Sequence, residues 1–520
     1  MILVNMFKFL LMFFLFTLLL VYFNFILMKK NLYILFSEIY FYSNNNLTFF
    51  IDSSSLMFLM IIMFVVFNVM NFMLYYMNKE KNFKMFFIMT MMFVFSMLLL
   101  VSSLNLMLMF FGWEGLGISS FYLIFFFNNY DSWNSAFKTF INNKLGDIMI
   151  MMMIILLIMT KEMYLMSFLF CLSLLTKSAQ FPFMAWLPMA MSAPTPISAM
   201  VHSSTLVTAG LYLFYRFMNN LISLFNLNFF SFITLLTMMF SGLKAITEKD
   251  MKKLIALSTL SQISLMLFLM MENYKMLAFI YMCNHALFKS MMFINMGVMM
   301  INNFSNQFYN NMNVSNLNIL TNLSMKISCL NLMSMLFFSS FFLKEQITMM
   351  FFLSNFNIMK ILVFIISSFL TMNYMLKMIK FINLSNPKVK INNKMKFKKF
   401  KLSFLLFNMM SIMYSKMMIY IMILPSNLNL IIMYLYMLML YLNKKIYKFK
   451  MKNILMLMYL DYLMYNLSNI LNKNLNNNDL WMEMLTLNYF FNFKSKKIKF
   501  FKMNFKMIII LLMIMLLNIL

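Results

Sequence analysis

The residues of this chain best suited to chemistry are ionisable groups placed inside long apolar runs. Glu114 stands in the segment Gly112-Trp113-Glu114-Gly115-Leu116-Gly117, Lys177 ends an apolar run, and Lys344 and Glu345 stand together inside another. A charged group in hydrocarbon is costly, so such groups are rare and are candidates for moving ions through a membrane. The glycines beside Glu114 would let another helix come close. The alternative for Glu114 is a structural carboxylate paired with a neighbouring helix.

Lys177 stands just before a proline-rich stretch. It is followed by Pro182 and Pro188, and then by Ser192-Ala193-Pro194-Thr195-Pro196. Proline interrupts the hydrogen-bond ladder of a membrane helix, and such a break persists only where protein or water satisfies the freed groups. A lysine beside a helix break is typical of transporter ion sites. The alternative is a lysine whose long side chain reaches the membrane surface.

Other polar side chains repeat at helical spacing within apolar runs. Lys144 and Asp147 are three residues apart, which places them on one helix face, where they can form a local ion pair or serve transport. Polar faces in several runs favour a proton relay over isolated core residues. The further groups are Ser198, His202, Thr205 and Thr208; Ser258, Thr259, Ser261 and Gln262; and Tyr281, His285 and Lys289.

The sequence contains no pattern for a bound cofactor or metal. Cys171, Cys283 and Cys329 lie in apolar stretches, at spacings that fit neither a metal site nor a disulfide framework. No dinucleotide fingerprint, phosphate-binding loop, iron–sulfur cysteine pattern or zinc motif is present. We therefore expect no redox centre, cofactor or metal in this chain.

The composition identifies the solvent in which the chain folds. Of 520 residues, 63% are apolar and only 11% are charged, with a mean hydropathy of +0.82. Soluble proteins carry roughly 25% charged residues, so a water-soluble globular enzyme is excluded, and the 18% of aromatic residues exclude a disordered chain. The net charge of +28 comes from lysines placed between apolar runs, which favours membrane orientation and not nucleic-acid binding.

Apolar runs of about 20 residues, long enough to cross a bilayer as helices, predict an all-α polytopic membrane protein. The lysine-rich loops at 79–84, 249–253, 388–401 and 444–452 then all fall on one side, which the positive-inside rule assigns to the matrix or cytoplasm. We expect fifteen spans, near 3–28, 56–77, 84–102, 104–127, 135–159, 163–181, 196–217, 222–243, 252–271, 274–301, 326–356, 358–381, 402–424, 426–443 and 504–520.

Two segments outside these spans have patterns of their own. Residues 31–55 mix polar and aromatic residues around Asn44-Asn45-Asn46, which predicts a small hairpin outside the membrane. Residues 479–503 alternate apolar and polar residues and end in several lysines. This segment predicts an amphipathic helix along the membrane surface, or alternatively a lysine-rich loop.

The order of the motifs resembles a known family. The sequence is similar to the chain 5 family of mitochondrial NADH:ubiquinone oxidoreductase, the distal antiporter-like membrane subunits of respiratory complex I. The wider family includes the Mrp-type sodium/proton antiporters. The resemblance is dense over about residues 100–300. It rests on Gly112-Trp113-Glu114-Gly115-Leu116-Gly117, Lys177-Ser178-Ala179-Gln180, Trp186-Leu187-Pro188, Pro194-Thr195-Pro196-Ile197-Ser198-Ala199, His202-Ser203-Ser204-Thr205, Lys252-Lys253, Ser258-Thr259 and His285-Ala286-Leu287-Phe288-Lys289.

The resemblance implies two inverted five-helix repeats, here 84–217 and 222–381, each with a broken helix that carries a lysine. The chain departs from the family pattern at Lys344, because no Gly or Pro precedes it where a broken helix is expected. Tyr281 also stands where the family commonly has a second relay histidine. The remaining regions are N-terminal helices and a hairpin (1–83), C-terminal helices and basic loops (382–478), a lateral amphipathic helix (479–503) and a final transmembrane anchor (504–520).

The resemblance also implies the roles of single residues. Lys177 matches the lysine of the first broken helix, and Glu114 matches its partner glutamate. Burial disfavours the charge on Lys177 and a nearby carboxylate favours it, so moving the influence of Glu114 would switch proton loading and release. The other matches are Asp147 beside the proton-uptake path, His202 and His285 as relays, Lys289 in the second half-channel, and Lys344 with Glu345 at the outlet.

The function implied is proton translocation, coupled to electron transfer from NADH to ubiquinone in other subunits. NADH, FMN, iron–sulfur clusters and ubiquinone would be bound by those subunits and none by this chain. We expect the mitochondrial inner membrane, basic loops facing the matrix, and partners among the membrane-arm subunits, above all the neighbouring antiporter-like subunit. Phospholipids including cardiolipin are further expected partners. The alternatives are an Mrp-type sodium/proton antiporter subunit and a non-conducting scaffold of the membrane arm.

Overall fold

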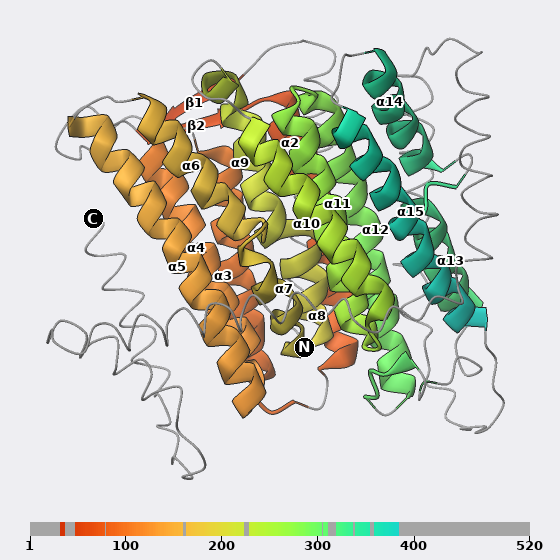
Figure 1. Cartoon of the computed structure of the whole chain (residues 1–520). Helices are drawn as coiled ribbons and strands as arrows, with labels where there is room; N and C mark the ends of the chain where they lie inside the picture. Colours follow the sequence, from red (N-terminus) through yellow and green to blue (C-terminus); the bar gives the residue numbers. More distant parts are fainter. Residues whose placement is uncertain are drawn as a thin grey trace, which may run out of the picture. The chain divides into compact units, whose positions relative to one another are not determined.

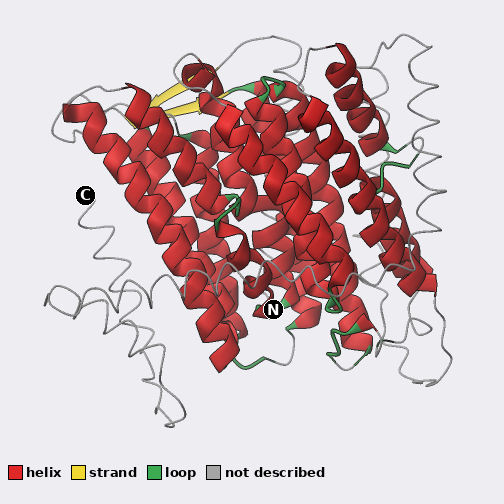
Figure 2. Ribbon diagram, in the orientation of Figure 1, coloured by secondary structure: helices red, strands yellow, loops and turns green. Residues whose placement is uncertain are grey.

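The computed structural model of the chain describes residues 32–36, 47–77, 80–103, 105–159, 163–222, 228–303, 305–309, 312, 319–335, 338–353 and 358–383. All of them belong to the first of two compact units, Met1–Leu457. Helices make up nearly all of this part (Figure 2), as the apolar runs predict. The spans expected near 3–28, 402–424, 426–443 and 504–520, the basic loops at 388–401 and 444–452, and the surface helix at 479–503 lie outside the described residues.

A two-stranded hairpin precedes the first described helix. Strands β1 (Leu32–Phe36) and β2 (Leu47–Ile51) pair antiparallel, with Leu32 opposite Ile51. The hairpin expected within residues 31–55 is therefore confirmed. Asp52 follows β2 and caps α2 (Ser53–Tyr76): its carboxylate accepts from the Ser55 amide at 3.1 Å, and the Ser55 hydroxyl oxygen accepts from the Asp52 amide at 2.9 Å. This reciprocal pair satisfies amide groups that the start of a helix leaves free.

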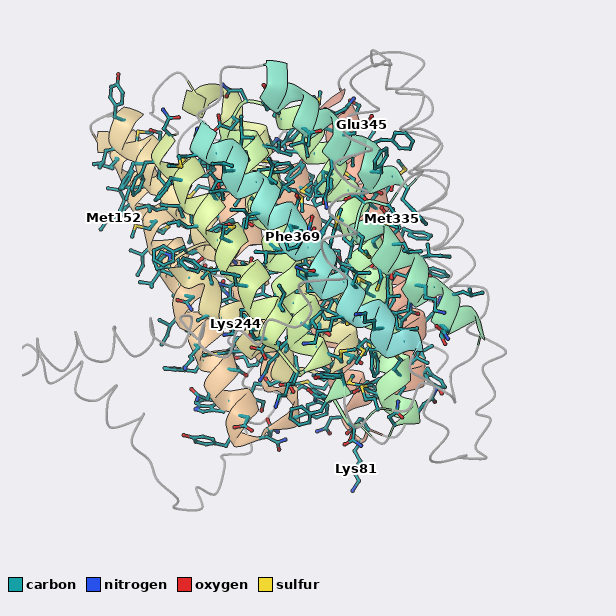
Figure 3. The ribbon with its side chains drawn as sticks, turned by 45° about the vertical axis from the view of Figure 1, so that its right-hand side comes forward. Lys81, Met152, Lys244, Met335, Glu345 and Phe369 are labelled. Carbon is teal, nitrogen blue, oxygen red and sulfur yellow. The ribbon has the colours of Figure 1, made fainter. Side chains whose placement is uncertain are left out.

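Three continuous helices follow at the positions that the apolar runs predict. They are α3 (Phe83–Ser102), α4 (Leu106–Ile124) and α5 (Tyr130–Met159), with one 3₁₀ turn, η1 (Phe125–Phe127), after α4. Helix α5 keeps an apolar outer face, on which Ile148, Met152 and Ile155 are exposed. Met152 lies on that outer side in Figure 3. An apolar face of this kind suits lipid or a neighbouring membrane subunit.

The next two crossings are built from short pieces. Helix α6 (Met163–Lys177) ends at Lys177, and the chain continues as η2 (Phe183–Ala185), α7 (Trp186–Met189) and η3 (Ala190–Ser192). It then turns back as α8 (Thr195–Ile197), the π-helical segment η4 (Ser198–Thr205) and α9 (Leu206–Ile222). In Figure 1, α7 and α8 lie towards the lower end of the bundle, while α6 and α9 lie above them.

A second series of helices completes the described part. It consists of α10 (Asn228–Thr247), α11 (Met251–Met271), α12 (Lys275–Asn302), α13 (Ile319–Leu332), α14 (Ser339–Leu353) and α15 (Ile358–Asn383). The apolar run at 326–356 is interrupted, so the broken helix that the resemblance implies is present although no Gly or Pro precedes Lys344. The chain leaves the helix after Leu332, because Ser334 adopts a left-handed backbone conformation with φ of 55°.

The two series pack in the same order. Helix α3 packs on α4, α4 on α5, α5 on α6 and α6 on α9; correspondingly, α10 packs on α11, α11 on α12, α12 on α13 and α13 on α15. Helices α9 to α12 lie between α5 and α6 on one side and α13 to α15 on the other (Figure 1). Helix α11 is buried along almost its whole length, so the core of the described bundle surrounds it.

Length and composition qualify nine of the described helices to cross a membrane. The chain is an integral, multi-pass membrane protein. Lys81, in the loop before α3, and Glu345, on α14, lie towards opposite ends of the bundle (Figure 3). Because the described crossings alternate in direction, the α10–α11 loop with Lys249, and Lys253 in the first turn of α11, lie at the same end as Lys81.

Candidate functional site

A charged group of three residues lies where α4 and α5 meet. The Lys144 ammonium on α5 is 2.6 Å from the Glu114 carboxylate on α4 and 3.1 Å from the Asp147 carboxylate one turn along α5. Asp147 is buried, whereas the side chains of Lys144 and Glu114 are 34% and 25% exposed to solvent. The ion pair expected for Lys144 and Asp147 is present. Lys144 in addition binds Glu114, the carboxylate that the family resemblance pairs with Lys177.

Lys177 is fully buried beside this group. Its ammonium donates to the Trp113 carbonyl oxygen at 2.9 Å and lies 4.7 Å from the centre of a Trp113 ring. Gly117 adjoins it, because a Cβ built there would lie 3.6 Å from the ammonium nitrogen, an ordinary contact distance. The charges of Asp147, Lys144 and Glu114 all act on Lys177. Lys177 thus contacts the backbone one residue before Glu114, without a salt bridge between the two side chains.

Helix α6 ends at Lys177 because the backbone leaves the helical conformation directly after it. Ala179 has a left-handed φ of 55°, and the Gln180 amide donates back to the Leu175 carbonyl at 3.0 Å. This pattern satisfies carbonyl groups that the end of a helix leaves free. The Thr176 carbonyl is taken by the indole N–H of Trp186 at 3.1 Å. The break therefore begins before Pro182 and Pro188, from which it was predicted.

His202 lies in the π-helical segment η4. The Leu206 amide donates to the carbonyl of Val201, five residues earlier, which is the spacing of a π-helix. Regular α-helical spacing of Ser198, His202 and Thr205 is therefore lost. The His202 ring is fully buried, its centre lies 6.1 Å from that of Trp186, and neither ring nitrogen has a hydrogen-bond partner within the described residues.

His285 and Lys289 lie one turn apart on α12 and are both buried. The Lys289 ammonium donates to the Ser258 hydroxyl oxygen on α11 at 2.5 Å. Both ring nitrogens of His285 lack a hydrogen-bond partner in the part of the chain that the structure describes. Segment η4 packs on both α11 and α12, so the helix of His202 adjoins the helices of these residues.

Tyr281, one turn before His285, belongs to a buried hydrogen-bond network. Its hydroxyl donates to the Gln262 side-chain oxygen, and the Gln262 amide nitrogen donates to the Tyr374 hydroxyl on α15 at 3.4 Å. The Tyr374 hydroxyl is also 2.9 Å from the Ser261 hydroxyl. Tyr281 therefore joins α12 to α11 and α15, at the position where a relay histidine is common.

Lys344 lies beside the second helix break. Its ammonium donates to the Leu332 carbonyl, the last of α13, at 3.3 Å. Asn331 holds the other side of the break: its side-chain nitrogen donates to Ser339 at 3.1 Å, and its side-chain oxygen accepts from the Ser340 amide at 3.1 Å. Glu345 follows directly but forms no salt bridge with Lys344.

Two buried polar residues of the site were not singled out from the sequence. Asn143 is 1% exposed, adjoins Lys177 across Gly117, and has no partner for either side-chain polar atom among the described residues. Its position next to Lys144 was the available signal. For Tyr374 the available signal was its helical spacing from Ser367 and Thr371 in the same run. Within the described residues, no three histidine, cysteine, aspartate or glutamate side chains form a cluster suited to a metal ion.

Residues 103–371 match the family described as "NADH:quinone oxidoreductase/Mrp antiporter, TM". The chain belongs to this family. The match begins just before α4 and ends within α15, so it includes every residue of the site described above except Tyr374. The fold class, the broken helices and the antiporter-like character expected from the sequence are thereby confirmed.

Curated relatives in the NADH:quinone oxidoreductase/Mrp antiporter family carry one name. The chain is 38% identical over 348 residues to "NADH-ubiquinone oxidoreductase chain 5" of Caenorhabditis elegans, covering 65% of this chain and 66% of the relative. It is 36% identical over 357 residues to the protein of the same name from Anopheles gambiae, covering 64% and 60%. The matches thus span slightly less than two-thirds of these relatives.

Two solved structures share the fold. A chain of the Mrp complex from Dietzia sp. DQ12-45-1b superposes with a TM-score of 0.70 at 18% identity, covering 89% of this chain and 57% of that one. A chain of the membrane-bound sulfane sulfur reductase, an archaeal respiratory membrane complex, gives 0.68 at 18% identity, covering 84% and 91%. The antiporter-like architecture is therefore common to membrane complexes of different chemistry.

Proposed function

We propose that this chain translocates protons as a membrane subunit of NADH:ubiquinone oxidoreductase, driven by electron transfer that other subunits carry out. The observation that carries the proposal is Lys177, buried at the end of a broken helix beside the Glu114–Lys144–Asp147 group. A fully buried lysine is costly to charge without a partner and easy to charge with one. Small movements of the neighbouring carboxylates would therefore load or release its proton.

Lys144 is the switching arm in this proposal. Its ammonium binds Glu114 and Asp147 together, and both lie within reach of the charge on Lys177. When Lys144 swings towards Asp147 alone, the freed Glu114 carboxylate would stabilise a protonated Lys177. When Lys144 binds Glu114 again, the Lys177 charge loses that support and the proton leaves.

His202, His285 and Lys289 would pass protons between the two halves of the chain. The support is that the two histidines are buried with all four ring nitrogens unpartnered within the described residues. Buried polar groups without a protein partner are the groups that bind internal water, and water with imidazole forms a proton relay. Lys344 with Glu345 would form the outlet, away from the end that carries Lys81 (Figure 3).

The repeats 84–217 and 222–381 remain part of this proposal. Their support is the matching packing order of the two helix series and the broken helix in each. The regions 1–83, 382–478, 479–503 and 504–520 would be the N-terminal hairpin and helices, the C-terminal helices with basic loops, the lateral helix and the last anchor.

The same proposal places the chain in the mitochondrial inner membrane with its basic loops in the matrix. Its partners would be other membrane-arm subunits, above all the adjoining antiporter-like subunit, and phospholipids such as cardiolipin. The exposed apolar face of α5 supports such a neighbour. NADH, FMN, iron–sulfur clusters and ubiquinone would be used by other subunits. There are two rival functions. One is a sodium/proton antiporter, which the fold shared with a chain of the Mrp complex supports. The other is a scaffold that does not conduct protons.

The test is Glu114→Gln in the assembled complex, reconstituted into liposomes and driven by NADH. Glu80→Gln, which neutralises an exposed carboxylate at the α2–α3 loop, is the matched control. We expect Glu114→Gln to lower the protons moved per electron strongly, and Glu80→Gln to leave the ratio unchanged. An unchanged ratio in the fully assembled Glu114→Gln complex would contradict the proposal. Sodium uptake that replaces proton uptake in the unmodified complex would favour the antiporter instead.

A further inference from the structure

A second buried lysine, Lys252, is unused by the pathway described so far. It is the second residue of α11 and only 4% exposed, whereas the side chain of the next residue, Lys253, is 46% exposed and forms a salt bridge with Asp250 at 3.0 Å. Lys252 forms no salt bridge among the described residues. Its ammonium has three N–H donors, and its one hydrogen bond goes to the Ala193 carbonyl at 3.2 Å.

The position of Lys252 links an aqueous end of the bundle to the helix of His202. Lys252 stands in the first turn of α11, directly after the loop that carries Lys249 and one residue before the exposed Lys253. Its hydrogen-bond acceptor, Ala193, immediately precedes the run of α8, η4 and α9. Helix α11 also packs directly on both η3 and η4. A group here can exchange protons with water at the basic end and face the interior at the same time.

Polar groups continue from Lys252 along α8 and η4. The Thr195 hydroxyl is buried, and the Ser198 hydroxyl donates to the Thr195 carbonyl at 2.9 Å. His202 follows with two unpartnered ring nitrogens. Seven residues separate Thr195 from His202, which is about 10 Å along a helix at 1.5 Å per residue. Two or three water molecules would bridge that distance between polar side chains.

We propose that Lys252 is a further proton carrier, which takes protons from water at the basic end and delivers them towards His202. This inference rests on the proposed function. An N–H proton of the Lys252 ammonium would pass through hydrogen-bonded water to a ring nitrogen of His202, leaving Lys252 as a neutral amine and His202 as a cation. His202 would pass its proton on, and Lys252 would be recharged by a proton from the basic side, so that each cycle moves one proton and leaves both residues unchanged.

The competing explanation is structural: Lys252 would only satisfy the Ala193 carbonyl. Two variants separate the explanations, because both keep an N–H donor for that carbonyl. Lys252→Gln keeps a donor without a titratable proton, and Lys252→Arg keeps a cation that does not release its proton. A structural cap tolerates both changes, whereas a carrier tolerates neither. Lys253→Gln and Lys253→Arg are matched controls on the adjacent exposed lysine.

The experiment measures protons moved per electron in assembled, reconstituted complex carrying each variant, with Lys177→Met as the reference. We expect Lys252→Gln and Lys252→Arg to lose as much pumping as Lys177→Met, and the Lys253 variants to lose none. Full pumping with either Lys252 variant would overturn the inference. If one variant does not assemble, the other decides alone. Thr195→Val, which removes a single buried hydroxyl, is a milder change for which we expect a partial loss of pumping. If Lys177→Met itself pumps normally, the proposed function fails and this inference fails with it; if Lys177→Met is inactive while Lys252→Arg pumps normally, only the inference fails.

Discussion

The chain breaks a membrane helix twice, and the two breaks share one backbone design. Ala179 and Ser334 each have a left-handed φ of 55° two residues after the helix ends, and the next amide donates back five residues. These bonds are 3.0 Å from Gln180 to Leu175 and 3.1 Å from Met335 to Leu330. A left-handed residue other than glycine costs on the order of 1–3 kcal/mol, so a surrounding structure must hold each one in place.

The breaks differ in the group that binds the freed carbonyls. At the first break, the Thr176 carbonyl accepts from the Trp186 indole, which does not titrate, and Lys177 is left to bind the Trp113 carbonyl on α4. At the second break, Lys344 itself binds the Leu332 carbonyl. One lysine therefore stands before its break and points away from it, and the other stands after its break and caps it. The same backbone turn can therefore leave the buried lysine free of the break, as at Lys177, or be capped by it, as at Lys344.

The largest expected effect concerns Lys177. Lys177→Met should abolish proton movement through this chain, and Lys177→Arg should also impair it because a guanidinium does not release its proton. Neither change should alter the first break, because Trp186 and not Lys177 caps it. Proton pumping by reconstituted complex measures the first effect, and hydrogen exchange at the Gln180 amide measures the second. Faster exchange at Gln180 in Lys177→Met would show that Lys177 stabilises the first break, as Lys344 stabilises the second.

Lys344→Met should have two effects where Lys177→Met has one. It should lower pumping, since the outlet loses its titratable group, and it should loosen the second break by removing the hydrogen bond to the Leu332 carbonyl. A hydrogen bond from a charged group contributes roughly 1.5–3 kcal/mol, so exchange at the Met335 amide should quicken by about ten-fold or more. Unchanged exchange at Met335 in Lys344→Met would remove the contrast between the two breaks.

Trp186→Phe tests the cap of the first break with a smaller effect. It deletes the indole N–H that binds the Thr176 carbonyl and keeps an aromatic ring beside His202. A neutral hydrogen bond contributes about 1 kcal/mol, so exchange at Gln180 should quicken by about five-fold, with a modest loss of pumping. Phe170→Leu, a change in α6 away from the break, serves as the control. A loss of pumping equal to that of Lys177→Met would mean that Trp186 has a role beyond capping.

The smallest effect is expected from glycine at the left-handed positions. Ala179→Gly and Ser334→Gly should each relieve backbone strain and stabilise the turn by about 1 kcal/mol or less. Hydrogen exchange at the following amide should then be slower. The gain should be larger at Ser334, because glycine there also removes a buried hydroxyl that has no hydrogen-bond partner within the described residues. Stabilities from thermal dissociation of the assembled complex would check the sign. Destabilisation at both positions would show that the breaks are held by side-chain packing and not by the backbone turn.

Several parts of the site could be read from the sequence because their cause is local or one-dimensional. The helix positions follow from apolar runs of the length that a bilayer requires, and β1 and β2 follow from polar and aromatic residues around an asparagine turn. Glu114, Lys177, His202 and Lys289 stood out because ionisable residues are rare in such runs. The Lys144–Asp147 pair followed from their spacing of three residues on one helix.

Other parts depend on contacts between distant segments, which no local pattern encodes. The packing of α4, α5 and α6 decides whether Glu114 pairs with Lys144 or with Lys177. The second break contains neither Gly nor Pro; side-chain hydrogen bonds from Asn331 and Lys344 stabilise it instead. The π-helical turn at His202 and the bond of Lys252 to Ala193 are of the same kind. The sequence by itself thus determined where the described helices lie and which ionisable residues stand inside them. Only the tertiary structure decided which of them meet, because in a bundle of apolar helices the few polar groups bind whichever partner the packing brings within hydrogen-bond distance.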